Sequence, residues 1–349
     1  MAIEDAEVCV WREGKAGRLT LNRPAALHAL NTNMCLLMTK ALIAWADDPA
    51  VDMILLDHAE NTRGFCAGGD VRMLAESGKS DGKQAREFFA AEYRLNALIQ
   101  SYQKPFISIL DGVTMGGGVG ISVHGSHRVA TENTVFAMPE ASIGLFPDVG
   151  GSWFLPRLEG ELGTWLALTG ARLKSRDALA AGIATHFADA GQVAKLKDAL
   201  CKEGLPALQA LETRADGSFS PYLQRLNACF NLGTVEAICT ALERAGDDWS
   251  DTQLERIKAG SPTSLKVALA QVRRGRDMQS FPDVMRMEYR VGSRVVMSPD
   301  FQEGVRATLI DKSGHPKWRP EALEAVEPKD IDLIFSPLPG KELQMVWED

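Results

Sequence analysis

The chain of 349 residues is long enough to form one extended domain or two domains, and its 45% hydrophobic and 24% charged residues are typical of a globular protein. Its formal net charge of -8 argues against a nucleic-acid partner, because a protein that binds nucleic acid needs a basic face. Six scattered cysteines without a C-x-x-C pair argue against zinc or redox chemistry, so no metal site is expected. The N-terminus has the pattern of neither a signal peptide nor a transit peptide, and no stretch makes a convincing membrane span. We therefore expect a cytoplasmic protein without a membrane partner.

The first part of the chain alternates between strand and helix patterns. Short β-prone runs mark the strands, and apolar residues at helical spacing mark the helices. Such alternation favours an α/β protein with a largely parallel sheet. The predicted elements are strands at 8–11 and 18–22, a helix at 34–46, a strand at 53–57, a helix at 86–102 and a strand at 106–110.

After about residue 190 the strand patterns fade and helical patterns dominate. We therefore predict two regions, 1–190 and 191–349, the second of them helical. The tail after Lys312 contains five prolines and is predicted to be an extended segment packed on the rest. Helices are predicted at 193–202, 205–214, 235–245, 252–259 and 263–274, with linkers at 218–221 and 246–250.

Two segments share a design of strand, glycine loop and helix start. One loop ends at Gly69 and the other contains Gly117. Glycine lets backbone N–H groups approach a ligand closely, and free N–H groups at a helix start favour negative charge. Two such donors on one carbonyl oxygen would form an oxyanion hole. Either loop alone is equally compatible with a simple tight turn, and no named dinucleotide, phosphate-loop or nucleophile-elbow pattern is complete here.

Two acidic residues, Glu140 and Asp148, lie in an otherwise apolar stretch, each directly after a proline. A carboxylate in apolar surroundings is costly unless it is paired or used, so both are candidate catalytic residues. The alternative is that they are exposed turn acids or helix caps. Glu92, on the predicted helix 86–102, is interpreted first as a solvated or ion-paired residue. The histidines form neither a metal-ligand pattern nor a local triad motif.

With these segments in place, the sequence resembles the crotonase (enoyl-CoA hydratase/isomerase) superfamily. The resemblance implies a crotonase-like spiral of ββα units followed by a helical C-terminal region. It also implies that the N–H groups of Gly69 and Gly117 hold the thioester oxygen of a CoA substrate. The matching motifs are LNRP at 21–24, FCAGGD at 65–70, DG through MGGG at 111–118 and MPE at 138–140.

Two differences from the hydratase pattern indicate which family within the superfamily the sequence resembles. Hydratases carry a glutamate where this chain has Gly120, and usually a small residue where it has Asp148. This combination, together with the tail motifs at 303–312 and 316–320, is similar to the 3-hydroxyisobutyryl-CoA hydrolase family. The resemblance to that family implies that Glu92, Gly117, Glu140 and Asp148 line the substrate site, with Glu140 and Asp148 catalytic.

The resemblance implies an acyl-CoA thioester hydrolase acting on a short β-hydroxyacyl-CoA, with 3-hydroxyisobutyryl-CoA of valine catabolism as the favoured substrate. No separate cofactor is expected, because CoA is part of the substrate. A homo-oligomer is compatible with the superfamily, in which trimers and hexamers are common. The alternatives are an enoyl-CoA hydratase or isomerase with altered acids, and a non-catalytic scaffold homologue.

Overall fold

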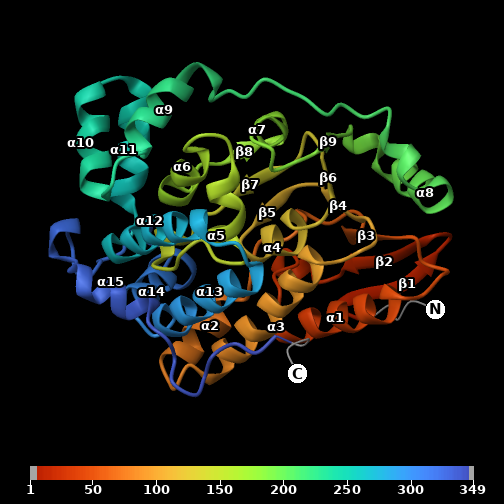
Figure 1. The fold of residues 1–349 in the computed structure, drawn as a ribbon, viewed down its shortest axis with the longest axis horizontal. Coiled ribbons are helices and arrows are strands. Elements are labelled where there is room, and N and C mark those ends of the chain that lie inside the picture. Colours follow the sequence, from red (N-terminus) through yellow and green to blue (C-terminus); the bar gives the residue numbers. More distant parts are fainter. Residues whose placement is uncertain (1–5, 346–349) are drawn as a thin grey trace. The chain divides into compact units, whose positions relative to one another are not determined.

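The computed structural model describes residues 6–345 (Figure 1). The chain forms two compact units, and each unit is made of three separate segments. Met1–Gly69, Leu95–Ala137 and Arg172–Ser218 make the first unit, and Asp70–Arg94, Met138–Ala171 and Phe219–Asp349 make the second. The division predicted from the sequence, 1–190 and 191–349, stays a prediction.

All the named strands of the described residues belong to the first unit. The larger sheet has the order β1-β2-β3-β4-β6-β9, and the smaller one has the order β5-β7-β8. Within the larger sheet of the described residues only the β1–β2 pair is antiparallel, which confirms the predicted largely parallel sheet. The strands are β1 (Val8–Glu13), β2 (Ala16–Leu21), β3 (Met53–His58), β4 (Phe106–Leu110), β5 (Val113–Met115), β6 (His127–Ala130), β7 (Val135–Ala137), β8 (Leu173–Lys174) and β9 (His186–Phe187).

The sheet core follows from the two-residue period of a strand. Met53 and Leu55 of β3 share one face with Ile107 and Ile109 of β4, and they pack with Leu200 of helix α8. The intervening residues of both strands are buried too. Because both faces are buried, these strands appear in the sequence as continuous apolar runs, which is typical of parallel strands.

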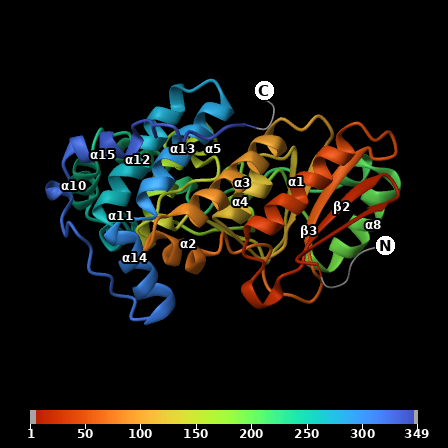
Figure 2. The same cartoon turned by 90° about the horizontal axis from the view of Figure 1, so that it is seen from below.

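Helices cover the sheet of the first unit. Helix α1 begins after Asn31, whose side chain accepts a hydrogen bond of 2.9 Å from the Met34 N–H and so caps the first turn. Figure 2 shows α1 lying along β1 to β3. The helical elements of this unit are η1 (Pro24–Ala26), α1 (Thr32–Ala46), α4 (Gly117–Val123), α7 (Ser175–Ala180), η4 (Ala190–Gln192), α8 (Val193–Glu203) and η5 (Leu205–Leu208), with the end of α3 (Lys83–Gln100).

All the secondary-structure elements in the described residues of the second unit are helical. Its later helices start at side-chain caps: Asp247, Ser261, Ser280 and Ser298 each accept a backbone N–H of the first turn. The elements are α2 (Val71–Gly78), most of α3, η2 (Glu140–Ile143), α5 (Gly151–Phe154), η3 (Leu155–Arg157), α6 (Leu162–Thr169), η6 (Ser220–Tyr222), α9 (Leu223–Phe230), α10 (Val235–Ala245), α11 (Asp248–Ala259), α12 (Pro262–Asp277), α13 (Phe281–Val295), α14 (Pro299–Val305), η7 (Arg306–Ile310), η8 (Leu323–Ala325) and α15 (Pro328–Phe335).

Three local predictions are wrong. The helix predicted at 205–214 is only the short η5, because the next stretch pairs with β9: the Phe187 N–H donates to the Glu212 carbonyl at 2.8 Å. The linker predicted at 246–250 already contains the start of α11, which Asp247 caps. The tail predicted to be extended contains the helix α15, with Pro328 in its first turn, where proline is tolerated, while residues 313–322 and 336–345 form no helix.

No helix in the described part of the chain is both long and apolar enough to cross a membrane.

Candidate active site

The two glycine loops lie side by side in the first unit. The Cys66 N–H donates to the Val113 carbonyl at 2.9 Å, and the Met115 N–H donates to the Cys66 carbonyl at 3.0 Å. These bonds join the loop after β3 to β5. A Cβ atom on Gly118 would overlap the Cys66 carbonyl oxygen, so the close approach requires glycine at this position.

Gly69 and Gly117 end these loops with unpaired N–H groups. Gly117 is the first residue of α4, and Gly116 before it has a φ of 46°. A Cβ placed on Gly68 would lie 3.9 Å from the Gly117 nitrogen, so the two loop ends are close together. Neither the Gly69 N–H nor the Gly117 N–H donates to an acceptor in the described residues. The structure therefore brings two backbone donors together at the ends of the two loops, one on the half-buried Gly69 and one on the buried Gly117.

The three acids named from the sequence are buried in the second unit. Glu92 of α3, Glu140 of η2 and Asp148 before α5 are 2%, 6% and 5% exposed, respectively. The interpretation of Glu92 as a solvated helix residue is therefore wrong, as is that of Glu140 and Asp148 as exposed turn acids. The cause is packing: each acid lies on the buried side of its element, where Asp148 contributes to the electrostatic environment of Glu92 and Glu140, and Glu140 contributes to that of Glu92.

Burial is the largest influence on the pKa values of the acids in this cluster. It raises the pKa of Glu92 and of Glu140 well above the ordinary value, and the neighbouring charge of Asp148 raises both further. Burial also raises the pKa of Asp148, to about 6, although a hydrogen bond from Tyr93 opposes the shift. The titrations of Glu92 and Glu140 therefore depend on the charge of Asp148.

Two oxygens of the cluster have no hydrogen-bond partner in the described residues, one on Glu92 (Oε1) and one on Glu140 (Oε2). Most buried polar atoms are hydrogen-bonded, because an unpaired one costs free energy. These oxygens can therefore accept or share a proton with a bound polar group.

Sequence reasoning did not identify Tyr93, which follows Glu92 on α3. Its hydroxyl donates to Asp148 Oδ2 at 2.7 Å, and the side chain is fully buried. The hydrogen bond stabilises the ionised carboxylate. A tyrosine beside an acid on a helix carries no distinctive sequence signal, so only the fold reveals the contact.

Glu288 of α13 is the second residue that was missed. Its carboxylate accepts hydrogen bonds of 2.8 Å from the N–H groups of Gly150 and Ser152, directly after Asp148. Burial raises the pKa of Glu288 to about 8, against the lowering effect of these two bonds. The intervening Val149 has a φ of 53°, a strained conformation for a β-branched residue. Glu288 lies on the apolar side of α13. An acid among the apolar positions of a helix pattern indicates a buried, functional carboxylate, and this signal could have identified Glu288 from the sequence.

Residues 16–335 match the enoyl-CoA hydratase/isomerase family. The chain belongs to this family. The predicted resemblance and the crotonase fold are thereby confirmed.

Several curated relatives share one name. The 3-hydroxyisobutyryl-CoA hydrolase of Gallus gallus is 45% identical over 353 residues, which cover 97% of this chain and 91% of the relative. The enzyme of the same name from Homo sapiens is 44% identical, covering 97% of this chain and 90% of the relative. The similarity therefore spans both units.

Solved structures of the family carry other names. A carnitinyl-CoA dehydratase from Mycobacterium thermoresistibile has a TM-score of 0.94 and 40% identity, over 99% of this chain and all of that one. An enoyl-CoA hydratase from Rhodobacter sphaeroides has a TM-score of 0.90 and 36% identity, over 97% of this chain and all of that one. The fold is thus shared among relatives with different named reactions.

The relatives correct the expected location. The hydrolases from Gallus gallus, Xenopus tropicalis and Homo sapiens are all named as mitochondrial, which contradicts the prediction of a cytoplasmic protein. That prediction depended on the lack of a targeting pattern at one end of the sequence, and such a lack does not determine a compartment.

Proposed function

We propose that the protein hydrolyses the thioester of a short β-hydroxyacyl-CoA, namely 3-hydroxyisobutyryl-CoA, to the free acid and CoA, as a step of valine catabolism. Support comes from relatives of that name that are 42–45% identical over nearly the whole chain. No further cofactor is proposed. Whether the protein forms a homo-oligomer stays a prediction.

One observation favours hydrolysis over hydration. The described acid cluster contains Glu140 beside a second buried acid, Asp148, while α4 carries Gly120 in place of the glutamate typical of hydratases. Addition of water to a double bond uses both hydratase glutamates, and this chain retains one of them. A single buried glutamate with a raised pKa can carry acid–base or nucleophilic chemistry on a thioester.

In the proposed reaction the N–H groups of Gly69 and Gly117 stabilise the negative charge that develops on the thioester oxygen. Loss of one such donor costs about 3–4 kcal/mol of barrier. Glu140 activates a water molecule or attacks the carbonyl carbon itself. In the first case Glu140 takes the proton of the attacking water, the carbon–sulfur bond breaks, and Glu140 returns this proton to the CoA thiolate. In the second case the thiolate leaves as an anhydride forms with Glu140, and the water that hydrolyses the anhydride supplies the proton to the thiolate. Asp148 orients the β-hydroxyl or the water, and Glu92 completes the polar end of the site.

The role of Glu140 is tested by thiol release from 3-hydroxyisobutyryl-CoA, followed with a thiol reagent. We expect Glu140→Gln to lower kcat by about 10²–10⁴-fold, because the amide cannot exchange a proton. Glu159→Gln, at an exposed glutamate of the same unit, is the matched control. Unchanged turnover in Glu140→Gln would remove the assigned role, and a wild-type protein that releases no CoA would refute the function.

Isotope labelling distinguishes the two forms of the mechanism. In a single turnover in ¹⁸O-water, attack by Glu140 itself forms an anhydride, and its hydrolysis at the glutamyl carbonyl leaves the label on the enzyme. General-base catalysis places the label only in the released acid. Mass spectrometry of the peptide containing Glu140 measures the difference.

The second candidate is hydration or isomerisation of an enoyl-CoA, which the names of the solved relatives favour. It would consume an enoyl-CoA substrate without releasing thiol. The same assay with an enoyl-CoA, followed by both enoyl absorbance and thiol release, separates the two reactions. A non-catalytic scaffold would act on neither substrate.

A further inference from the structure

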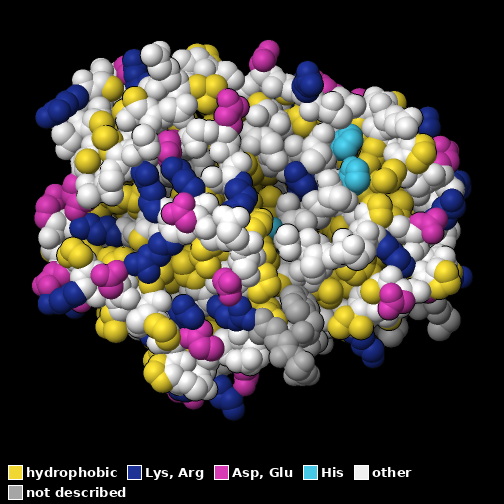
Figure 3. Space-filling model, viewed as in Figure 1, with side chains coloured by type: hydrophobic (Ala, Val, Ile, Leu, Met, Phe, Trp, Pro, Cys, Tyr) yellow, Lys and Arg dark blue, Asp and Glu magenta, His cyan; other side chains and the backbone are white. Residues whose placement is uncertain are grey.

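Two histidines of the first unit lie side by side on the larger sheet. His127 belongs to β6 and His186 to the neighbouring strand β9, where it pairs with Val129. Because side chains two residues apart in a strand share one face, His127 and His186 project from the same face of the sheet. Their ring centres are 5.7 Å apart, and Figure 3 shows histidine side chains together on the surface over these strands. The two residues are far apart in the sequence, so residue spacing did not reveal the pair.

Each imidazole is held by a hydroxyl group at its Nδ1 atom. The distance is 2.8 Å from His127 Nδ1 to Ser126 Oγ, and 2.8 Å from His186 Nδ1 to Thr185 Oγ1. Each hydroxyl also donates its proton to a backbone carbonyl oxygen, at 3.2 and 3.1 Å respectively. A hydroxyl has a single proton, so one that donates to a carbonyl accepts from the imidazole N–H. The contacts therefore favour the tautomer with the proton on Nδ1 and the lone pair on Nε2.

The Nε2 atoms of both rings remain as acceptors. Neither has a hydrogen-bond partner in the described residues. Metal-binding histidines are commonly oriented in this way, with the other ring N–H bound to a fixed acceptor. Two imidazoles on one tetrahedral ion, with metal–nitrogen bonds of about 2.0 Å, have ring centres about 5 Å apart. The observed 5.7 Å needs only a small closing movement of two partly exposed side chains.

The charge state of the two rings also suits a cation. Burial lowers the pKa of both imidazoles, and the positive charge of Arg128 lowers both further. The neutral imidazole, the form that binds metal ions, is therefore present at neutral pH. The Arg128 guanidinium is held against the backbone, because it donates to the carbonyl oxygens of Ile183 and Gly125 at 2.6 and 2.7 Å. Its charge opposes a second cation nearby, so we expect a moderate affinity.

We propose that His127 and His186 together bind one divalent transition-metal ion through their Nε2 atoms. The class of ion follows from the ligands, because imidazole nitrogen suits Zn²⁺, Cu²⁺ and Ni²⁺, whereas Mg²⁺ and Ca²⁺ prefer oxygen. The described residues contain no group of three or more His, Cys, Asp or Glu side chains that could hold a metal ion, so this site has two protein ligands and water completes the coordination. The ion links β6 to β9, the edge strand of the larger sheet in the described residues, and this role is separate from the proposed thioester hydrolysis.

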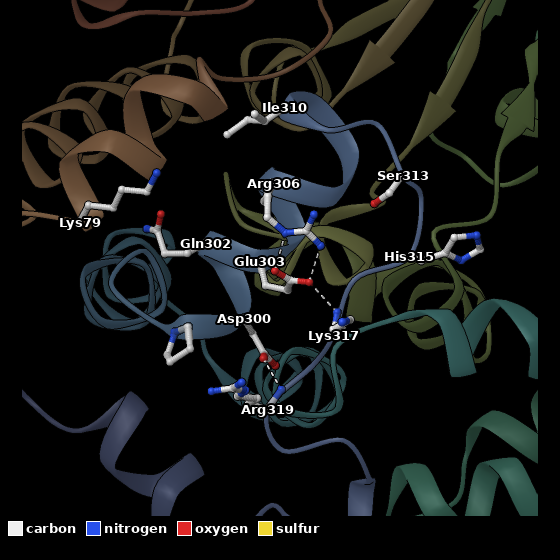
Figure 4. Close-up of a pocket in the computed structure, with 11 residues that line it drawn as sticks. Lys79, Asp300, Gln302, Glu303, Arg306, Ile310, Ser313, His315, Lys317 and Arg319 are labelled. Atoms are coloured by element: carbon white, nitrogen blue, oxygen red, sulfur yellow. Dashed lines mark hydrogen bonds and ion pairs between the residues drawn. The ribbon is translucent and has the colours of Figure 1, made fainter.

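Binding of Zn²⁺ to the full chain is measured by calorimetry, with His127→Gln and His186→Gln as the test variants. Glutamine keeps a polar side chain but is not among the usual zinc ligands. The control is His315→Gln, at an exposed histidine of the second unit, and Figure 4 shows no second histidine among the residues drawn around it. We expect wild type and control to bind one Zn²⁺ with equal affinity. Each test variant should bind it at least about a hundredfold more weakly, because both nitrogens are needed.

Thermal unfolding shows that the variants fold and gives a second measure of binding. Only the folded chain holds the two imidazoles together, so Zn²⁺ should raise the Tm of wild type and control but not that of the test variants. Unchanged zinc affinity in either test variant, or no zinc binding by wild type, overturns the proposal.

A measurement on the wild-type protein does not depend on any variant. Diethyl pyrocarbonate acylates the unprotonated ring nitrogen of histidine, and mass spectrometry of peptides locates the modified residues. We expect Zn²⁺ to protect His127 and His186 from modification but to leave His315 reactive. Protection of only one residue of the pair, or of neither, contradicts a shared ion.

Discussion

At the scale of single residues, the protonation of Asp148 depends on one hydroxyl group. Tyr93 donates to the Asp148 carboxylate at 2.7 Å and so opposes the effect of burial on its pKa. Without that bond the ionised form is less stable, and the pKa of Asp148 moves above its value of about 6.

We therefore expect Tyr93→Phe to shift the acidic limb of the kcat/KM profile to higher pH, so that activity is lost mainly below neutral pH. The measurement is the pH dependence of thiol release. Tyr222→Phe, which alters an exposed tyrosine stacked on Trp249 in the same unit, is the control. A Tyr93→Phe profile that superimposes on the wild-type profile contradicts this account of Asp148.

Single residues also show which parts of the site could be predicted from the sequence. Glu140 and Asp148 were identifiable because they interrupt an apolar run, which is a local feature. The burial of Glu92 was not predicted, because a single acid on an amphipathic helix looks the same whether it faces water or another element. Its surroundings come from segments far away in the chain.

At the scale of elements, the start of α4 depends on close contact with the neighbouring loop. Gly118→Ala would push a methyl group into the Cys66 carbonyl, which belongs to a hydrogen-bonded backbone and cannot rotate away. Overpacking of this kind costs about 1–3 kcal/mol of unfolding free energy, and movement of α4 also displaces Gly117.

We expect Gly118→Ala to lower both stability and kcat, as measured by chemical denaturation and thiol release. Gly191→Ala is the matched control in the same unit, because nothing lies within 4 Å of its added Cβ. A Gly118→Ala protein as stable and active as Gly191→Ala would show that the contact with Cys66 is not required.

The second element of interest is the start of α5, which Glu288 holds. Each of its two carboxylate oxygens accepts one backbone N–H after Asp148. In Glu288→Gln one N–H would face an amide NH₂ group, so an unpaired donor would loosen the segment.

We expect Glu288→Gln to reduce kcat about tenfold or more while KM changes little, because Asp148 loses its fixed orientation. Steady-state kinetics of thiol release measure both constants. Unaltered kcat would mean that Val149 and the other contacts of the segment hold Asp148 without Glu288.

At the scale of the whole molecule, the buried acids make stability depend on pH. The folded-state pKa of Glu288 is about 8 against an ordinary value of 4.5, and that of Asp148 is about 6 against 3.8. The folded protein therefore binds these protons more tightly than the unfolded chain. Their contribution to stability is present at low pH and is lost as pH rises through this window.

We expect the unfolding free energy of wild type to fall more than that of Glu288→Gln between about pH 5 and about pH 8, by about 1 kcal/mol or more. Urea denaturation at the two pH values measures this difference. Equal changes in the two proteins would show that Glu288 does not titrate in this window.

Features that are local in the chain could be predicted from the sequence alone. These are the strands β1 to β4, helices such as α1, α3 and α12, the two glycine loops and the acids at 140 and 148, because each is encoded by residue spacing within a short segment. The tertiary structure decided which side chains are buried together. Tyr93 and Asp148 are 55 residues apart, and Glu288 and Gly150 are 138 apart. Burial and proximity set the pKa values of these acids, and both arise from long-range packing that a single sequence does not display.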